Sequence, residues 1–307
     1  MKTVTGPIAV QGRARWRPDR WMSWLYVLPA LLLLAAVMGL PIIRAVLMSF
    51  QRFTLTELVS GNTPFVGFDN YARAFADPTF PVALVNSIVF TVVSIALQFS
   101  IGLGLALLFG RGFPLSNTFR GLMLTGWQIP VVVTGTLFLW MFNVDYGLVN
   151  FILQSLHLIT EPIGWTVDAG AALPAVIIAN VWLGIPFNLI LLSAAIAGLP
   201  SDIYEAATVD GASSWQKTRH LTLPLLRPAI LAVLVLGFIY TLRVFDLIWI
   251  MTKGGPGTAT EVLPTFAYRL AFVHFDFGKS AAVAVVVLSI LFVAAIAYLR
   301  SAHSDEP

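Results

Sequence analysis

The sequence EAATVDGASSWQKTRHLTLP fills residues 205–224 and is the longest polar and charged interruption in the C-terminal half of an otherwise apolar chain. It predicts two short helices separated by a sharp break. Ser201 is expected to cap the first helix, with Asp202 and Glu205 in or near its first turn, where the helix dipole favours negative charge. Gly211 is expected to end it, because a helix stop needs a residue that tolerates a left-handed backbone.

A second helix is predicted to follow immediately. Ser213 and Gln216 stand three residues apart, which is the spacing of a capping box, and the helix is expected to run into Pro224. Residues 201–224 would then form a compact bend, which we call the elbow. A solvated loop between two hydrophobic spans is the plainer alternative for the same residues.

The composition places the chain in a bilayer. Of its 307 residues 58% are hydrophobic and 11% are charged, against about 25% charged in soluble domains. The mean hydropathy is +0.86. Cysteine is absent, which excludes disulfides and cysteine nucleophiles, and the net charge of +3 gives no indication of nucleic-acid binding. The sequence therefore predicts an all-α membrane protein.

Six transmembrane helices are predicted from the apolar runs. The first run is too long for the apolar region of a signal peptide, the competing interpretation, and lacks a clear cleavage site. The predicted layout is a basic tail over residues 1–23, a six-span domain over 24–300 and a polar tail over 301–307. The expected spans are residues 25–43, 83–109, 121–142, 173–199, 230–251 and 280–299.

Charge asymmetry orients these spans. With six spans, both termini and the elbow lie on one side. The segments on that side contain eleven Lys and Arg residues, whereas the opposite loops contain five. Because basic flanks stay in the cytoplasm, the termini and the elbow are expected to be cytoplasmic.

Prolines and glycines mark special positions within the spans. Pro130 is expected to kink the third span and Pro186 to break the fourth, while Pro228 suits the first turn of the fifth. Gly102 and Gly104 in the second span are small enough to let another helix approach closely.

The elbow resembles the EAA loop of bacterial ABC-importer permeases. The resemblance implies that the elbow docks in a groove of a cytoplasmic ATPase and transmits the closure of that ATPase to the spans. One departure is Thr218, where the family usually has an aromatic residue, so Trp215 is expected to carry part of the docking. The matching positions are Glu205, Ala206, Ala207, Asp210, Gly211, Ala212, Leu223 and Pro224.

Other stretches are similar to the carbohydrate-importer permeases, in particular to the maltose and glycerol-phosphate permease subunit. The resemblance covers nearly the whole chain after about residue 22. It implies a type I ABC importer permease fold in the bacterial cytoplasmic membrane. It also implies a second homologous permease subunit, two ATPase subunits that hold ATP and Mg, and an extracytoplasmic solute-binding protein. The stretches are residues 65–71, 182–187, 243–248, 252–257, 268–272 and 276–278.

Catalytic chemistry is not indicated. Gly278-Lys-Ser280 matches the end of a phosphate-binding loop, but the required glycine five positions before Gly278 is Val273. The four histidines are scattered without metal-ligand spacing. We therefore expect no catalytic residue, no metal and no cofactor on this chain, with ATP hydrolysis in a separate subunit.

Arg243 and Asp246 are charges inside the predicted fifth span. Each costs roughly 2.5–3.5 kcal/mol at the bilayer centre, so this helix is not expected to face lipid. Spaced three apart, the two can form a local ion pair that positions the helix. The alternative is a direct part in gating or solute passage.

The solute pathway is expected where the fourth and fifth spans are interrupted. The resemblance to the maltose-permease subunit implies contacts at six positions, to which two amides are added because sugars offer hydroxyls to polar groups and C–H faces to aromatic rings. Val244 offers nothing polar. The six are Gly184, Phe187, Gly237, Tyr240, Thr241 and Val244, and the additions are Asn180 and Asn188.

The predicted function is that of a transmembrane permease subunit of an ATP-driven importer for a sugar, polyol or related solute, forming half of the pore. The rival from another class is a secondary transporter driven by an ion gradient without an ATPase. A membrane enzyme is a third possibility, and it would turn over substrate without any partner.

Overall fold

The computed structural model describes residues 20–110 and 112–304. The chain divides into two units, residues 1–44 and 45–307. The described residues form helices joined by irregular segments. Their only β-structure is two isolated bridges, Gln51 with Phe65 and Thr54 with Asp276.

The first unit is an apolar helix. It consists of α1 (Arg20–Leu34) and a π-helical turn η1 (Ala35–Gly39), and it continues in α2 (Leu40–Ser49), which passes into the second unit. The helical run extends on both sides of the predicted span 25–43. Residues 1–19 of the predicted basic tail lie outside the described part.

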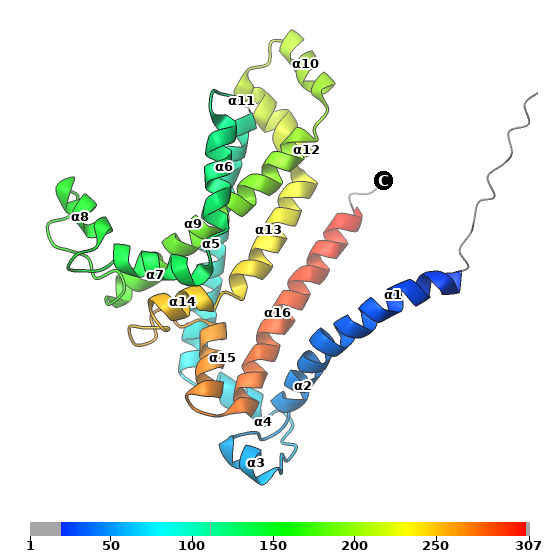
Figure 1. Ribbon diagram of the computed structural model, residues 1–307, viewed down its shortest axis with the longest axis vertical. Helices are drawn as coiled ribbons and strands as arrows, with labels where there is room; N and C mark the ends of the chain where they lie inside the picture. Colours follow the sequence, from blue (N-terminus) through cyan, green and yellow to red (C-terminus); the bar gives the residue numbers. More distant parts are fainter. Residues whose placement is uncertain (1–19, 111, 305–307) are drawn as a thin grey trace, which may run out of the picture. The chain divides into compact units, whose positions relative to one another are not determined.

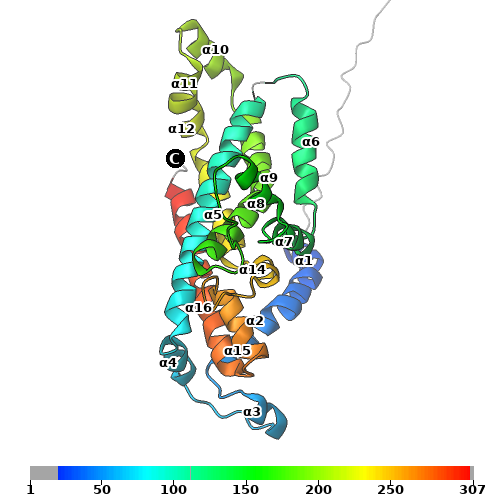
Figure 2. The same ribbon diagram turned by 90° about the vertical axis from the view of Figure 1, so that its left-hand side faces the viewer.

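The second unit is built around two long helices. α5 (Thr79–Gly110) and α9 (Ala169–Ala197) lie side by side, and α13 (Arg227–Leu242) packs on both (Figures 1 and 2). The elbow elements lie at one end of this unit and α3, α4 and α15 toward the other. The remaining elements are α3 (Leu55–Ser60), α4 (Asp69–Phe75), α6 (Ser116–Trp127), α7 (Val131–Met141), α8 (Leu148–Ser155), α10 (Ser201–Val209), α11 (Ser214–Lys217), η2 (Thr218–Thr222), α12 (Leu223–Leu225), α14 (Asp246–Met251), α15 (Leu263–Phe272) and α16 (Phe277–Ser304).

Four helices of the described part are long and apolar enough to cross a membrane, and six spans result when each of two bent helix pairs is one span. The four are Trp24–Ser49, Thr79–Gly110, Ala169–Ala197 and Phe277–Arg300. The bent pairs are Ser116–Trp127 with Val131–Met141 and Ser214–Leu225 with Arg227–Leu242. With each bent pair counted as one span, the total equals the six spans predicted from the sequence.

Proline acts differently from the prediction at two positions. The third span is not merely kinked, because α6 and α7 meet at 97° across the short break that contains Pro130. The predicted break at Pro186 is wrong, since α9 runs through both Pro174 and Pro186 without interruption. Neighbouring helices and side chains can satisfy the backbone groups that a proline frees in a buried helix. Pro228 lies in the first turn of α13, as predicted.

The fifth span is shorter than predicted. α13 ends at Leu242, and Arg243 to Phe245 are not helical before α14 begins at Asp246. The predicted continuous helix over residues 230–251 is therefore wrong. The two charges sit at the break between α13 and α14.

Gly102 provides the close approach between α5 and α9, and Gly104 does not. A Cβ added at Gly102 would lie 2.5 Å from the Cβ of Asn188 and 3.3 Å from the backbone nitrogen of Leu189, whereas one added at Gly104 would meet nothing within 4 Å. Only the first glycine therefore faces α9.

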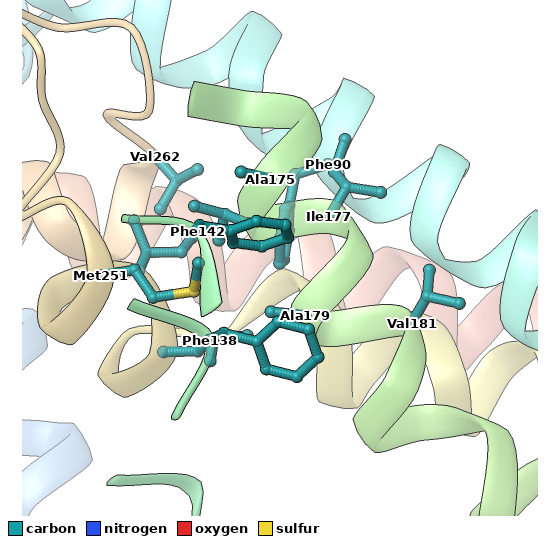
Figure 3. Close-up of a cluster of buried hydrophobic side chains, with 12 residues drawn as sticks. Phe90, Phe138, Phe142, Ala175, Ile177, Ala179, Val181, Met251 and Val262 are labelled. Carbon is teal, nitrogen blue, oxygen red and sulfur yellow. The ribbon is translucent and has the colours of Figure 1, made fainter. Parts of the chain in front are cut away.

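A hydrophobic cluster joins α7, α9 and α14 (Figure 3). Phe138 in α7 and the adjoining Phe142 lie against small side chains of α9, while Met251 closes the cluster from α14. Alanines at positions such as 175 and 179 let these aromatic rings approach the α9 backbone. This packing fixes the helices that line the cavity described below.

The stretch 65–71 organises the end of the unit opposite the elbow. The buried Asn70 side chain donates from Nδ2 to the carbonyl oxygens of Ser49 and Gln51, each at 2.8 Å. Arg73 in α4 forms an ion pair with Asp276, with 2.8 Å between Nη1 and Oδ2. The contacts of Asn70 and Asp276, which lie in two of the stretches that resemble the permease family, therefore hold the loop between α2 and α4 against the start of α16.

Asp77 and Lys279 form a second, largely buried ion pair here, with 2.6 Å between Oδ2 and Nζ. Burial acts to raise the pKa of Asp77, but the hydrogen bonds from Lys279 and from the Thr79 amide, together with the Lys279 charge, outweigh it and hold the pKa below its usual range. The pair thus contributes stability that is present above the unfolded-state pKa of about 4 and is lost as pH falls through the lower folded-state pKa.

We expect Asp77→Asn to lower the melting temperature of the detergent-solubilised protein at pH 7, because Lys279 loses its partner. The difference in melting temperature between wild type and variant should become smaller as the pH is lowered toward 3. The exposed Asp145 provides a control, and Asp145→Asn should change little. Equal melting temperatures for Asp77→Asn and wild type at pH 7 would contradict this role.

Candidate functional site

The first half of the elbow is α10. Asp202 lies in its first turn, as predicted, but Ser201 is the first helical residue, Pro200 precedes it and no side chain caps the helix. The predicted Ser201 cap is therefore wrong. Pro200 has an extended backbone immediately before α10, so the chain enters the helix without a side-chain hydrogen bond at this position.

Gly211 forms the break of the elbow. Its φ is +77°, in the left-handed region, and a Cβ there would meet nothing within 4 Å. The amide of Ala212 donates to the carbonyl oxygen of Ala207 at 2.9 Å, which closes the helix end as predicted. Glycine is therefore required at position 211 by the left-handed backbone conformation, since an added Cβ would not clash with a neighbour.

The second half begins with the predicted capping box. The Ser213 amide donates to Oε1 of Gln216 at 2.7 Å, and the Gln216 amide donates to Oγ of Ser213 at 3.3 Å. The helical path then continues through η2 and α12 to Leu225, past Pro224.

Two side-chain bonds tie the halves of the elbow to each other. Lys217 donates from Nζ to Oγ1 of Thr208 at 2.7 Å, and the hydroxyls of Tyr204 and Thr222 are 2.9 Å apart. These two hydrogen bonds brace the elbow, because each joins α10 to the second half.

Apolar side chains project from this unit. Val209 is 88% exposed and Trp215 is 69% exposed. Beside them is a hollow of about 310 Å³ lined by Ala207, Asp210, Gly211, Ala212, Gln216, Lys217, His220 and Leu221. Four of the eight residues matching the EAA loop therefore line one hollow. Glu205, Ala206 and Pro224 are exposed, and Leu223 is half-buried.

Thr218 lines a different hollow, of about 400 Å³, between the elbow and the ends of α5 and α9. Its Oγ1 donates to the carbonyl oxygen of Ser214 at 2.9 Å. The position where the family usually has an aromatic residue therefore faces the chain's own helices in this protein.

A cavity of about 410 Å³ lies deeper in the unit, among α5, α6, α7, α9, α13 and α14. Seven of the eight residues predicted for the solute pathway line it. They are Asn180, Gly184, Phe187, Gly237, Tyr240, Thr241 and Val244, and the other lining residues are Gln98, Trp127, Ile129, Val131, Leu183 and Leu247.

Asn188 is the exception and does not line the cavity. Its buried side chain donates from Nδ2 to the carbonyl oxygen of Gly184 at 2.8 Å, and its Cβ packs on Gly102. Asn188 therefore belongs to the contact between α5 and α9.

Two amides form the polar part of the cavity wall. Gln98 donates from Nε2 to the carbonyl oxygen of Asn180 at 2.8 Å. Each of these side chains is 5% exposed, and Nδ2 of Asn180 has no hydrogen-bond partner. A Cβ at position 184 would overlap the Gln98 carboxamide, so Gly184 makes room for it.

Aromatic rings form the other wall. Ring centroids are 6.2 Å apart for Trp127 and Phe187, and 5.7 Å apart for the edge-to-face pair of Phe187 and Tyr240. The guanidinium of Arg243 lies over the Tyr240 ring, with Cζ 4.9 Å from its centroid, a cation–π arrangement.

The predicted local ion pair between Arg243 and Asp246 is wrong. Both side chains are exposed, and no ion pair joins them in the part of the chain that the structure describes. The pairing assumed helical spacing, but the two residues flank a helix break. Arg243 instead contacts the Tyr240 ring, and a part in gating or solute passage stays a prediction.

Six residues of the cavity wall were not predicted from the sequence, and the polar Gln98 and the aromatic Trp127 are two of them. Gln98 is the one amide side chain in the apolar run from 87 to 110, and such a polar residue in a membrane helix is itself a signal of a functional or packing role. Trp127 could not be predicted from the sequence, because its place in the cavity wall depends on the sharp bend after α6.

The Gly278-Lys-Ser280 motif makes structural contacts. Lys279 pairs with Asp77, and Ser280 donates from Oγ to the carbonyl oxygen of Ala267 at 2.7 Å. Among the described residues no group of three His, Asp or Glu side chains could hold a metal ion.

Comparisons with known proteins show which family the chain belongs to. A family model described as "Binding-protein-dependent transport system inner membrane component" matches residues 98–303. The chain is 33% identical to a sulfoquinovosyl glycerol transport system permease protein of Agrobacterium fabrum, over 94% of this chain and 92% of the relative. It is also 33% identical to a diacetylchitobiose uptake system permease protein of Streptomyces coelicolor, over 98% and 92%.

A trehalose/maltose transport system permease protein of Thermococcus litoralis is 32% identical, over 91% of this chain and 92% of the relative. Among solved structures, a bacterial ABC transporter involved in alginate import contains a chain that superposes with a TM-score of 0.77 at 25% identity, covering 91% of this chain and 96% of that one.

Proposed function

Because the chain belongs to the binding-protein-dependent transport system inner membrane components and is an ABC carbohydrate-importer permease, we propose that it forms half of a solute pore whose movement is driven by a separate ATPase docked on the elbow. The family is one of membrane-embedded, multi-pass transport components, so an ion-driven secondary transporter is set aside.

The elbow supports the docking role. A partner surface that covered Val209 and Trp215 would remove two exposed apolar side chains from water, which favours association. The hollow at Asp210 and Gly211 would accept a projecting residue of that partner. The braces through Lys217 and Tyr204 would carry a displacement of the docked elbow into α13.

The complete transporter in this proposal has further subunits. A second homologous permease would complete the pore, two ATPase subunits would hold ATP and Mg, and an extracytoplasmic solute-binding protein would deliver the solute. A solved alginate ABC transporter in complex with an alginate pentasaccharide-bound periplasmic protein supports the last of these. The elbow and both termini would lie in the cytoplasm of a bacterial cell.

The cavity would hold a carbohydrate between the amides and the rings. Its volume falls within the range of small-molecule sites, about 300–1,000 Å³, and the wall combines an apolar majority with a few polar groups. ATP binding and the loaded binding protein would each favour one pore conformation through differential affinity. Arg243 and Asp246, exposed beside the cavity, would contact the moving solute or the facing subunit.

The observation that carries the proposal is the braced elbow with its exposed apolar side chains, on a chain of this family. The experiment is affinity purification of the tagged chain from its native membrane, followed by reconstitution in vesicles. We expect an ATPase to co-purify and uptake to require ATP. Uptake by the isolated chain that an ionophore abolishes would refute the proposal.

A further inference from the structure

We propose that the cavity takes an uncharged, hydroxyl-rich solute, whose hydroxyls are bound by the Gln98 and Asn180 amides, and that it rejects anionic sugars. This inference rests on the proposed function and specifies the class of carbohydrate. It separates neutral sugars from acidic ones, and the known relatives and structural neighbours include carriers named for either kind.

The first support is the absence of charge in the cavity wall. None of the cavity-lining residues is Asp, Glu, Lys, Arg or His, whereas the hollows at the elbow include Asp210 or Lys217. A carboxylate or sulfonate entering such a cavity would lose its hydration without gaining a counter-charge, which is far more costly than burying a hydroxyl.

Arg243 is not among the residues that line the cavity. Its guanidinium lies over the Tyr240 ring and outside the lining, and the carboxylate of Asp246 follows three residues later. The wall of the cavity itself therefore carries no cationic side chain.

The second support is the unused hydrogen-bonding capacity of the amides. Asn180 presents a buried Nδ2 donor without a partner, and Gln98, held through its Nε2, retains a carbonyl oxygen. A donor and an acceptor on two residues of the same cavity wall match a sugar hydroxyl, which both accepts and donates. Buried polar groups of this kind discriminate strongly, because a solute that leaves them unpaired incurs the full desolvation cost.

The third support is the arrangement that holds Gln98 in place. The carboxamide occupies the space left by the missing side chain of Gly184, and the rings of Phe187 and Tyr240 lie in the same cavity wall. Amides and aromatic faces together suit the two surfaces of a pyranose ring.

The test uses the complete complex, with its ATPase and binding protein, in lipid nanodiscs. ATP hydrolysis is measured with trehalose, maltose and diacetylchitobiose as neutral probes, and with sulfoquinovosyl glycerol and an alginate oligosaccharide as anionic ones. We expect stimulation by at least one neutral probe and by neither anionic probe. Gln98→Leu should raise the half-saturating concentration of the binding protein loaded with that probe, or lower the maximal stimulation, at least tenfold.

Thr91→Val is the matched control, since Thr91 is a buried hydroxyl on α5 outside the cavity wall, and it should stay within twofold of wild type. Stimulation by an anionic probe, by no neutral probe, or without loss in Gln98→Leu would overturn the inference while the proposed function stands. A chain that co-purifies with no ATPase would overturn both.

Discussion

Replacing Gly211 with valine is expected to reduce ATP-driven uptake by about tenfold or more. The residue adopts a φ of +77°, and a left-handed backbone costs an L-residue about 1–2 kcal/mol, more when it is β-branched. Since 1.4 kcal/mol is a factor of ten in a conformational equilibrium, the docked shape of the elbow would be depopulated. Uptake and ATPase stimulation by the reconstituted complex measure the effect.

Gly61 offers a matched control for this variant. It ends α3 with a φ of +71°, and a Cβ there also meets nothing within 4 Å. Gly61→Val introduces the same strain at the opposite end of the unit, so it should lower stability similarly while uptake per folded complex stays near wild type. Equal losses of uptake in both variants would show that strain alone, and not ATPase coupling, explains the Gly211 result.

Replacing Gly102 with alanine is expected to destabilise the protein through its central helix pair. The new Cβ would lie 2.5 Å from the Cβ of Asn188 and 3.3 Å from the α9 backbone, which cannot move like a flexible side chain. Overpacking of this kind typically costs 1–3 kcal/mol. The melting temperature in detergent should fall. Solute should also stimulate ATP hydrolysis by the complex less, because α5 and α9 form the walls of the cavity that Gln98 and Asn180 line.

Gly104→Ala is the internal reference, because it lies two residues away on the same helix and its Cβ meets no neighbour. Both variants gain the same helix propensity, so the difference between them isolates the contact with α9. A melting temperature for Gly102→Ala that matches Gly104→Ala would mean that α5 and α9 are not packed as described.

The elbow was predictable because its signals are local. A left-handed glycine and a capping box depend on a few adjacent residues, so Gly211, Ser213 and Gln216 take the expected conformations. The Ser201 cap was not predictable from the same logic, because Pro200 already sets the entry to α10.

The breaks in the membrane helices were less predictable because they depend on tertiary packing. Pro130 accompanies a bend of 97° while Pro186 leaves α9 continuous, although both are prolines in apolar runs. The break at Arg243 has no glycine or proline to announce it. The ion pair with Asp246 was predicted on helical spacing, and it failed for that reason.

The cavity was half predictable. The six positions taken from the family resemblance all line one cavity, and of the two amides added for their chemistry Asn180 lines it and Asn188 does not. Gln98 and Trp127 come from α5 and α6, whose placement beside α9 depends on the glycine contact at Gly102 and on the bend after α6. Neither feature is readable from residue type alone.

The most direct test of the account places a photoactivatable crosslinker at Val209, introduced through a single cysteine, which the cysteine-free chain permits. The same label at Val59, also strongly exposed but on α3, is the control. In the complete complex, illumination should join position 209 to the ATPase subunit in a yield that changes with bound ATP, and position 59 should give no such product. An ATPase adduct at neither position, or one at position 59 instead, would contradict the claim that the elbow is the docking site of the ATPase.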